Sequence, residues 1–191
     1  LEYVDQVIGR RPGVQNYYAM NVLMLPKRTV FICDTYVNHD PDAGQLAEMT
    51  LLAAEEIRRF GITPKIALVS HSDFGDSDAK SAQKMRIALD YIRKIDPELE
   101  VDGEMQADTA LVQTLRSKRL PDSHIAGDAN VLIMPNLDAA NIAYQLIKVL
   151  ADALPVGPIL IGTAKPAHIL TTSVTARGVV NMTALAVVEA Q

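Results

Sequence analysis

The sequence predicts an α/β fold in which helices sandwich a largely parallel sheet. Short apolar runs of strand length alternate along the 191 residues with longer stretches whose apolar residues recur at helical spacing. Consecutive strands are therefore separated by helices, which requires crossover connections and favours parallel pairing. Hydrophobic residues make up 49% of the chain and charged residues 21%, so the composition is that of an ordinary globular domain.

The chain begins with a predicted pair of neighbouring strands. Residues 17–25 and 29–33 are apolar and separated by a short turn, as in a hairpin. Asp40 precedes Pro41, which suits a helix N-cap followed by proline at the first helical position. A helix is therefore expected from there to about Arg59. Its apolar stripe is formed by Leu46, Met49, Ala53 and Ile57.

The rest of the chain continues this alternation. Residues 65–70 form an almost uninterrupted apolar run, as expected for a strand that is buried on both faces. By the same reasoning, further strands are expected at 99–103, 131–134 and 158–161, and further helices at 79–95, 108–117, 137–151 and 175–189.

Composition excludes several classes of function. The net charge of −5 and the lack of Lys/Arg runs longer than two residues argue against a nucleic-acid partner. No stretch approaches the roughly 20 apolar residues that span a bilayer, so no membrane partner is expected. Cys33 is the only cysteine, which rules out an internal disulfide and a cysteine-based metal cluster. We expect it to be a small buried hydrophobe in a reducing cytoplasm.

Polar segments follow several of the predicted strands. In an open α/β sheet, ligands collect beyond the carboxyl ends of the strands. The segments expected there are 34–38, 70–77, 102–104 and 135–136. Each segment alone can also be an ordinary turn or helix cap. Their convergence on one edge of the sheet is therefore a stronger indication of a ligand site than any single segment. The acidic residues of 70–77 do not have EF-hand spacing, and no metal site is expected.

Several motifs carry a family resemblance. They read Val101-Asp-Gly-Glu104, Pro135-Asn-Leu-Asp-Ala139 and Gly157-Pro-Ile-Leu-Ile-Gly162. Together they resemble the C-terminal half of phosphate acetyltransferases (phosphotransacetylases), and the resemblance covers nearly the whole chain. It implies an isocitrate or isopropylmalate dehydrogenase-like architecture. Residues 1–154 would form the second, dimer-forming domain, and residues 155–191 would complete a first domain whose earlier half lies upstream of Leu1.

The match fails at the family's catalytic positions. Residues 165–181 resemble the stretch that in the family reads Leu-Ser-Arg-Gly-Cys-Ser-Ala-Glu-Asp-Val. Its serine and arginine fall on Thr171 and Thr172, and the aspartate thought to act as base falls on Gly178. Threonine cannot supply the fixed charge of arginine, and glycine has no proton acceptor in its side chain. Loss of the base costs about 10²–10⁴-fold in rate and loss of an electrostatic donor about 10²–10³-fold, so the resemblance implies that no catalytic residue remains.

The loop Ser70-His-Ser-Asp-Phe-Gly75 refines the resemblance. Phosphate acetyltransferases typically read Ser-Phe-Ser-Thr-Lys-Gly-Ser there. The C-terminal domain of large bacterial NADP-dependent malic enzymes commonly reads Ser-His-Ser-Asn-Phe-Gly. This similarity implies a catalytically silent regulatory domain that binds acetyl-CoA as an allosteric inhibitor and helps to build a homodimer or a higher homo-oligomer. The candidate residues of its acetyl-CoA cleft are Asp34, Asn38, Ser70, His71, Ser72, Asn136, Lys165, Thr171 and Thr172.

The same resemblance assigns no cofactor to this chain. NADP and a divalent Mg or Mn ion, which serve the oxidative decarboxylation of malate to pyruvate, are expected in an upstream part of the polypeptide. Two other interpretations stay open. The chain could belong to an active phosphate acetyl- or butyryltransferase with a diverged site, or it could be a purely structural oligomerisation domain.

Overall fold

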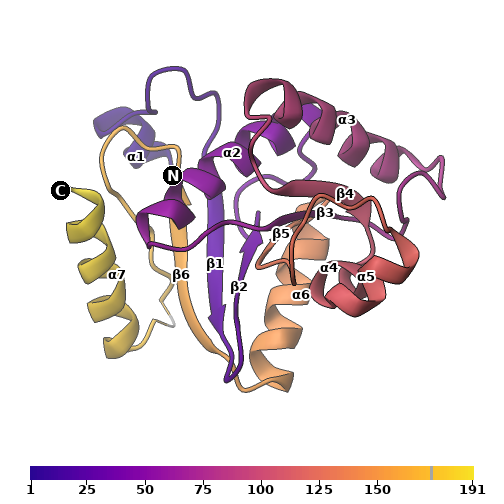
Figure 1. Cartoon of the computed structure of the whole chain (residues 1–191). Helices are drawn as coiled ribbons and strands as arrows, with labels where there is room; N and C mark the ends of the chain where they lie inside the picture. Colours follow the sequence, from indigo (N-terminus) through magenta and orange to yellow (C-terminus); the bar gives the residue numbers. More distant parts are fainter. Residues whose placement is uncertain (173) are drawn as a thin grey trace.

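A computed structural model describes residues 1–172 and 174–191 of the chain. Within these residues one six-stranded sheet runs through the molecule, with helices on both faces (Figure 1). Its strands, in spatial order, are β4 (Val101–Met105), β3 (Ile66–Val69), β5 (Val131–Ile133), β2 (Thr29–Cys33), β1 (Tyr18–Met24) and β6 (Leu154–Ile161). The strands from β4 to β2 pair in parallel, and β1 is antiparallel to both β2 and β6. The predicted α/β class with a largely parallel sheet is confirmed.

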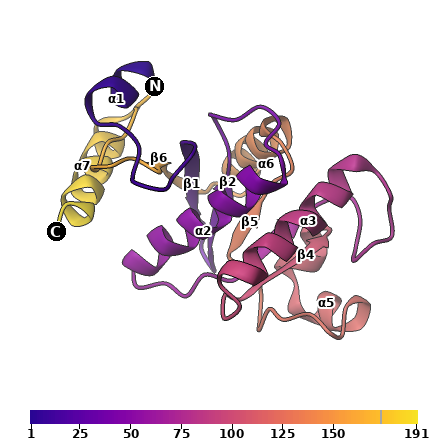
Figure 2. The ribbon, with the colours of Figure 1, turned by 90° about the horizontal axis from the view of Figure 1, so that it is seen from above.

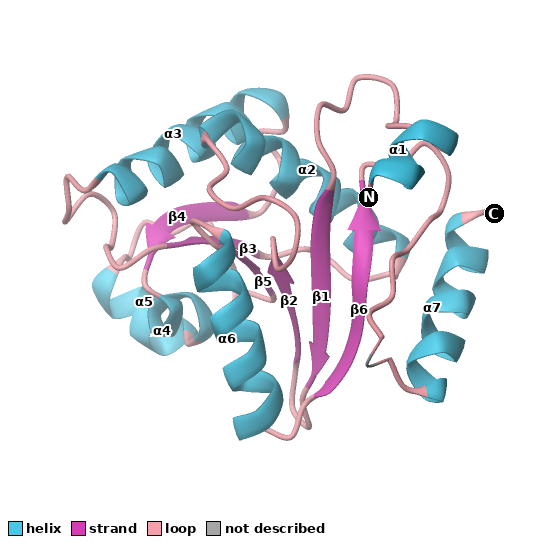
Figure 3. Cartoon of the chain, turned by 180° about the vertical axis from the view of Figure 1, so that it is seen from behind, coloured by secondary structure: helices cyan, strands magenta, loops and turns pink. Residues whose placement is uncertain are grey.

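Helices cover both faces of the sheet. One layer contains α2 (Ala43–Arg59) and α3 (Lys80–Ile95), and the other contains α4 (Ala107–Leu111), α5 (Gln113–Arg119) and α6 (Leu137–Leu150). Separate apolar cores fill the space on the two sides of the sheet. The remaining helices, α1 (Glu2–Val7) and α7 (Ala176–Glu189), lie at the β6 end of the sheet (Figure 3). No helix in the part of the chain that the structure describes is long and apolar enough to cross a membrane.

The hairpin of β1 and β2 lies between β5 and the edge strand β6. Its register pairs Met24 with Thr29 and Met20 with Cys33, as the short turn between the two runs predicts. Cys33 is fully buried beneath the helices, and burial followed by the neighbouring Asp34 carboxylate raises the pKa of its thiol. A thiol that stays protonated in an apolar environment is unreactive, so Cys33 is the buried hydrophobe that the sequence predicts.

Helix α2 begins later than predicted. Asp42, and not Asp40, is its N-cap: the Asp42 side chain accepts a hydrogen bond from Gln45 N at 2.8 Å, and the Gln45 side chain accepts one from Asp42 N at 2.9 Å. This reciprocal capping box satisfies two backbone donors, whereas a cap followed by proline satisfies fewer. Pro41 therefore precedes the helix.

Other boundaries also differ from the prediction, and the strand expected at 99–103 spans Val101–Met105. The expected helix at 108–117 is divided at Val112, which is extended, because Gln113 N donates to the Asp128 carboxylate at 2.8 Å instead of to a helical carbonyl. The expected strand at 158–161 begins earlier, at Leu154, although it contains Pro155 and Pro158. Proline lacks the N–H of a ladder bond and is tolerated on an edge strand such as β6.

Candidate functional site

The parallel strands bring their carboxyl ends to one edge of the sheet, as predicted. Ile133 of β5 pairs with Cys33 of β2 on one side and with Leu68 of β3 on the other, so the three strands end at nearly the same level. Segments 34–38, 70–77 and 135–136 follow directly. The segment 102–104 differs from the prediction because it lies inside β4 and not beyond it.

Asp34 organises the turn that follows β2. Its buried carboxylate accepts hydrogen bonds from the backbone N–H groups of Ala19, Tyr36, Val37 and Asn38 at 2.9–3.1 Å. The Asn38 side-chain amide donates to the same carboxylate at 2.6 Å and to the carbonyl of Tyr17 at 2.8 Å. Both carboxylate oxygens are thus engaged within the protein. Asp34 and Asn38 therefore fix the shape of the turn.

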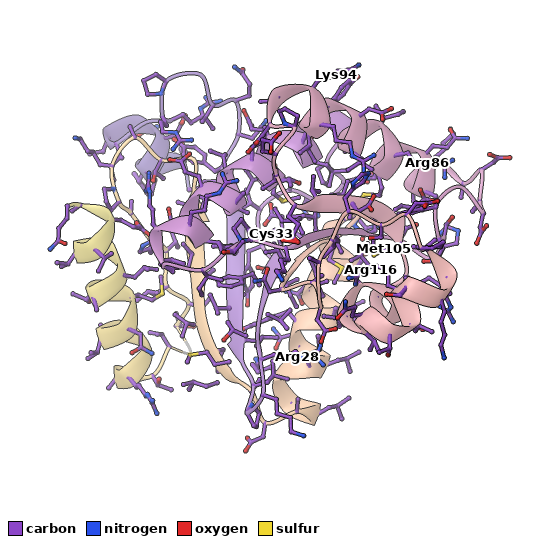
Figure 4. All side chains as sticks on the ribbon, in the orientation of Figure 1. Arg28, Cys33, Arg86, Lys94, Met105 and Arg116 are labelled. Atoms are coloured by element: carbon purple, nitrogen blue, oxygen red, sulfur yellow. The ribbon has the colours of Figure 1, made fainter. Side chains whose placement is uncertain are left out.

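The loop after β3 is anchored by Glu104, which belongs to the predicted polar segment 102–104 but is not among the nine candidate residues of the cleft. Glu104 is fully buried, and its Oε1 accepts from Ser72 Oγ at 2.6 Å, from Gly75 N at 3.0 Å and from Arg86 Nη1 at 2.7 Å. Arg86 lies on α3, as labelled in Figure 4, and forms an ion pair with this carboxylate. Among the candidates in this loop, Ser72 is therefore structural. His71 is exposed, with Nε2 3.1 Å from Ser77 Oγ.

Ser70 and Asn136, two further candidates at this edge, differ in their hydrogen bonding. Ser70 Oγ is buried and has no hydrogen-bond partner in the described part of the chain. Asn136 is the N-cap of α6, because its Oδ1 accepts from Ala139 N at 2.9 Å. The adjacent Leu137 N donates to His39 O at 3.0 Å, which joins this cap to the loop that follows β2. Like Asp34, Asn136 accepts a hydrogen bond from a backbone N–H group and so holds the adjacent backbone in place.

Thr171 lies on an apolar pocket between β6 and the turn after β2. The pocket has a volume of about 260 Å³ and is lined by Leu1, Ala19, Tyr36, Val37, Pro158, Leu160, Ile169 and Thr171. Typical sites for drug-sized ligands are about 300–1,000 Å³, so this pocket has room for a small apolar group only. The pocket therefore lies between the turn held by Asp34 and the segment that contains Ile169 and Thr171. Thr172 is exposed beside it.

Lys165 lies on a different cavity. This cavity measures about 450 Å³ and is polar, with Arg11, Glu55, Glu56, Arg59, Lys165 and Glu189 among its lining residues. Leu160 lines both hollows. The nine candidate residues are therefore distributed over the sheet edge and two cavities, and no single pocket contains all of them. Within the described residues, no group of three or more His, Cys, Asp or Glu side chains is arranged to hold a metal ion.

Gly178 occupies the first turn of α7. Its N–H donates to Oγ1 of Thr175, the N-cap of that helix, at 3.1 Å. A Cβ atom at this position would lie 2.8 Å from Val174 Cγ2, closer than carbon atoms normally approach. An aspartate at position 178 therefore requires Val174 to move. The position on which the resemblance places the family's base therefore has no side-chain proton acceptor, and a side chain there would contact Val174 closely.

Comparison with known proteins confirms the predicted resemblance. Residues 1–187 match the phosphate acetyl/butaryl transferase family. The chain is 55% identical over 189 residues to an NAD-dependent malic enzyme of Rhizobium meliloti (strain 1021), and equally so to an NADP-dependent malic enzyme of Escherichia coli (strain K12). The alignments cover 99% and 98% of this chain but 24% and 25% of those enzymes, so the chain spans about a quarter of their length. Among solved structures, the EutD phosphotransacetylase from Staphylococcus aureus matches with a TM-score of 0.93 and 29% identity, over 98% of this chain and 58% of that one.

Proposed function

Because this chain belongs to the phosphate acetyl/butaryl transferase family, we propose that it is a catalytically silent regulatory and oligomerisation domain of an NADP-dependent malic enzyme that senses acetyl-CoA. One observation carries the proposal. At the position on which the resemblance places the family's base, Gly178 offers no proton acceptor, and a Cβ atom added there would lie 2.8 Å from Val174 Cγ2. A chain that keeps the fold and lacks the base can still bind the ligand of its relatives without turning it over.

The proposed ligand site is the apolar pocket at Thr171. The acetyl group of acetyl-CoA would enter between Tyr36, Val37 and Leu160, where a short apolar group fits the volume of about 260 Å³. The sheet-edge candidates Asp34, Asn38, Ser70, His71, Ser72 and Asn136 would shape the walls around this pocket. Thr171, Thr172 and Lys165 would lie along the rest of the ligand, with Lys165 supplying positive charge towards its phosphates. The remainder of the coenzyme would contact parts of the polypeptide outside this chain.

Calorimetric titration of the full-length polypeptide with acetyl-CoA tests this site. Val37→Trp fills the pocket and is expected to abolish binding. Val112→Trp is a matched control, because Val112 is exposed between α4 and α5. Equal binding by wild type and Val37→Trp would exclude this pocket, and the absence of binding by wild type would favour the purely structural interpretation.

The oligomerisation role is supported by the outer face of α6. Ile142, Leu146, Val149 and Leu150 are each more than half exposed, and their spacing places them on one stripe of the helix. A contiguous apolar stripe on a helix surface is typical of a protein–protein interface. We therefore propose that a second copy of the chain covers α6 in a homodimer or a higher homo-oligomer.

The alternative function is an active phosphate acetyl- or butyryltransferase, as the similarity to a phosphotransacetylase allows. Formation of acetyl phosphate from acetyl-CoA and phosphate by the unaltered protein would establish it. Absence of this activity in wild type, with activity gained by Thr172→Arg and Gly178→Asp in a Val174→Ala background, would exclude it.

The wider organisation remains part of the proposal. It comprises the isocitrate or isopropylmalate dehydrogenase-like architecture, the division at residue 154, a cytoplasmic location, and NADP and Mg or Mn sites outside this chain. Strand β6 pairs with β1 across the proposed division, so residues 154–161 complete the same sheet as the preceding domain.

A further inference from the structure

A buried cluster of titratable side chains connects the end of α7 to α2. Glu56 lies on α2, Glu189 is the last residue of α7, and His168 belongs to the segment between β6 and α7. Their side chains are only 8%, 7% and 4% exposed. Because α7 lies at the end of the sheet beside β6 (Figure 2), this cluster is a principal polar attachment of its C-terminal turn.

The hydrogen bonds of the cluster leave two carboxylate oxygens without a partner. Leu160 N donates to His168 Nδ1 at 3.2 Å, and His168 Nε2 lies 3.3 Å from Glu189 Oε2 without making a hydrogen bond to any described residue. Glu56 Oε2 accepts from Arg59 Nη1 at 3.1 Å. Glu56 Oε1 and Glu189 Oε1 are buried and make no hydrogen bond to any described residue.

Two ionised carboxylates are unfavourable in such a place. Each buried oxygen without a donor loses its hydration, and the two negative charges repel each other. The nearby positive charge is shared, because Arg59 also pairs with Glu55, and Arg11 pairs with Glu55 at 2.7 Å. Lys165 lines the adjoining cavity. A single proton placed between the two carboxyl groups would convert one unsatisfied acceptor into a donor for the other.

We propose that Glu56 and Glu189 share one proton through their unpartnered oxygens, and that loss of this proton releases the C-terminal end of α7 from α2. The attachment also holds His168, and the segment between His168 and α7 contributes Ile169 and Thr171 to the apolar pocket. Release of α7 therefore changes one wall of that pocket. The fold thus contains a pH-sensitive latch, independent of which ligand the pocket binds.

The direction of the pH dependence follows from the electrostatics of the pair. Burial, then the Glu189 carboxylate, raise the pKa of Glu56 from 4.5 to about 7, while Arg59 and His168 act in the opposite sense. The attached state therefore holds the proton more tightly than the released state does. Attachment weakens as the pH rises from about 4.5 to about 7, and becomes independent of this pair above that range.

Hydrogen–deuterium exchange of the full-length polypeptide, at pH values from 5.5 to 8, tests the latch. After correction for the intrinsic pH dependence of exchange, protection of amides 185–191 is expected to fall by up to about tenfold per pH unit towards neutrality and then to level off. Protection of α3 serves as the internal reference. Constant protection of amides 185–191 across this range would overturn the proposal.

Amide substitutions assign the effect to the pair. In Glu56→Gln, the side-chain oxygen can still accept from Arg59 while its NH₂ donates permanently to Glu189. Glu189→Gln achieves the same from the other side, so each variant is expected to keep α7 protected up to pH 8. Glu55→Gln is the matched control: it removes an adjacent carboxylate that pairs with Arg11 and Arg59. The pH dependence should persist in this variant, with its midpoint at a lower pH, because Arg59 is then freed to pair with Glu56. If the pH dependence persists in both Glu56→Gln and Glu189→Gln, then His168 or another group causes it and the shared proton is excluded.

Discussion

Arg86 on α3 donates a hydrogen bond of 2.7 Å to Glu104, a carboxylate on β4 that is fully buried. The same Glu104 oxygen holds Ser72 and Gly75, so this one ion pair fixes the loop that follows β3. The loop carries the malic-enzyme-like motif, and its conformation therefore depends on a residue of the neighbouring strand.

Arg86→Met is expected to destabilise the protein by about 3–5 kcal/mol, because removing one partner leaves a buried carboxylate uncompensated. Urea denaturation followed by circular dichroism measures this loss. Arg58→Met is the control, since Arg58 pairs with Asp96 at the surface and such pairs contribute about 0–1 kcal/mol. Similar losses in the two variants would contradict the structural role of the Arg86 pair.

Asp34→Ala is expected to cost about 2–4 kcal/mol, because it leaves the backbone donors of the turn after β2 without an acceptor. The turn presents Tyr36 and Val37 to the apolar pocket, so acetyl-CoA binding should weaken at temperatures where the variant is still folded. Thermal melts and titration calorimetry measure the two effects. If the variant is destabilised but binds acetyl-CoA as tightly as wild type, then the turn after β2 is not part of the acetyl-CoA site.

The first turn of α7 allows a test by a double-mutant cycle. Alanine normally stabilises a helical position by about 1 kcal/mol relative to glycine. At Gly178 the new Cβ would lie 2.8 Å from Val174 Cγ2, so Gly178→Ala alone is expected to be neutral or destabilising. In a Val174→Ala background, Gly178→Ala should again increase the free energy of unfolding by about 1 kcal/mol. Chemical denaturation of wild type, the two single variants and the double variant measures this. A gain of the full amount from Gly178→Ala alone would show that the contact with Val174 is not restrictive.

The apolar stripe of α6 predicts the effect of a charge on assembly. Leu146→Lys places an ammonium group in the proposed interface and is expected to shift the full-length polypeptide to a smaller assembly in native mass spectrometry. The residue is 54% exposed within one chain, so the fold itself should tolerate the change. Ile87→Lys on α3, where Ile87 is 44% exposed, is the control and should leave the assembly unchanged. An unaltered mass for Leu146→Lys would place the interface elsewhere.

Local periodicity is sufficient to predict much of this fold. The apolar run 65–70 becomes the buried strand β3, and Met85, Leu89 and Ile92 form the inner face of α3. The errors occur where side chains decide a boundary. The Asp42–Gln45 capping box, and the hydrogen bond between Gln113 N and Asp128, depend on geometry that a hydrophobic pattern does not contain.

The candidate site is predictable in position but less so in role. Parallel pairing brings the polar segments to one edge because strand direction follows from the alternation of strands and helices. The sequence alone cannot show that Asp34 is occupied by backbone donors or that Lys165 and Thr171 face different cavities. Glu56, His168 and Glu189 form no motif and come together only through tertiary packing, so no sequence signal marks them.

The central claim is that this chain regulates a malic enzyme through acetyl-CoA without turning acetyl-CoA over. The most direct test is the rate of malate oxidation by the full-length polypeptide as acetyl-CoA is varied, in wild type and in Val37→Trp. Typical allosteric coupling is about 1–3 kcal/mol. Saturating acetyl-CoA is therefore expected to lower the rate of malate oxidation at low malate concentration by about 5–150-fold in wild type and to have little effect on that rate in Val37→Trp. A wild-type rate that does not respond to acetyl-CoA at any concentration would contradict the claim.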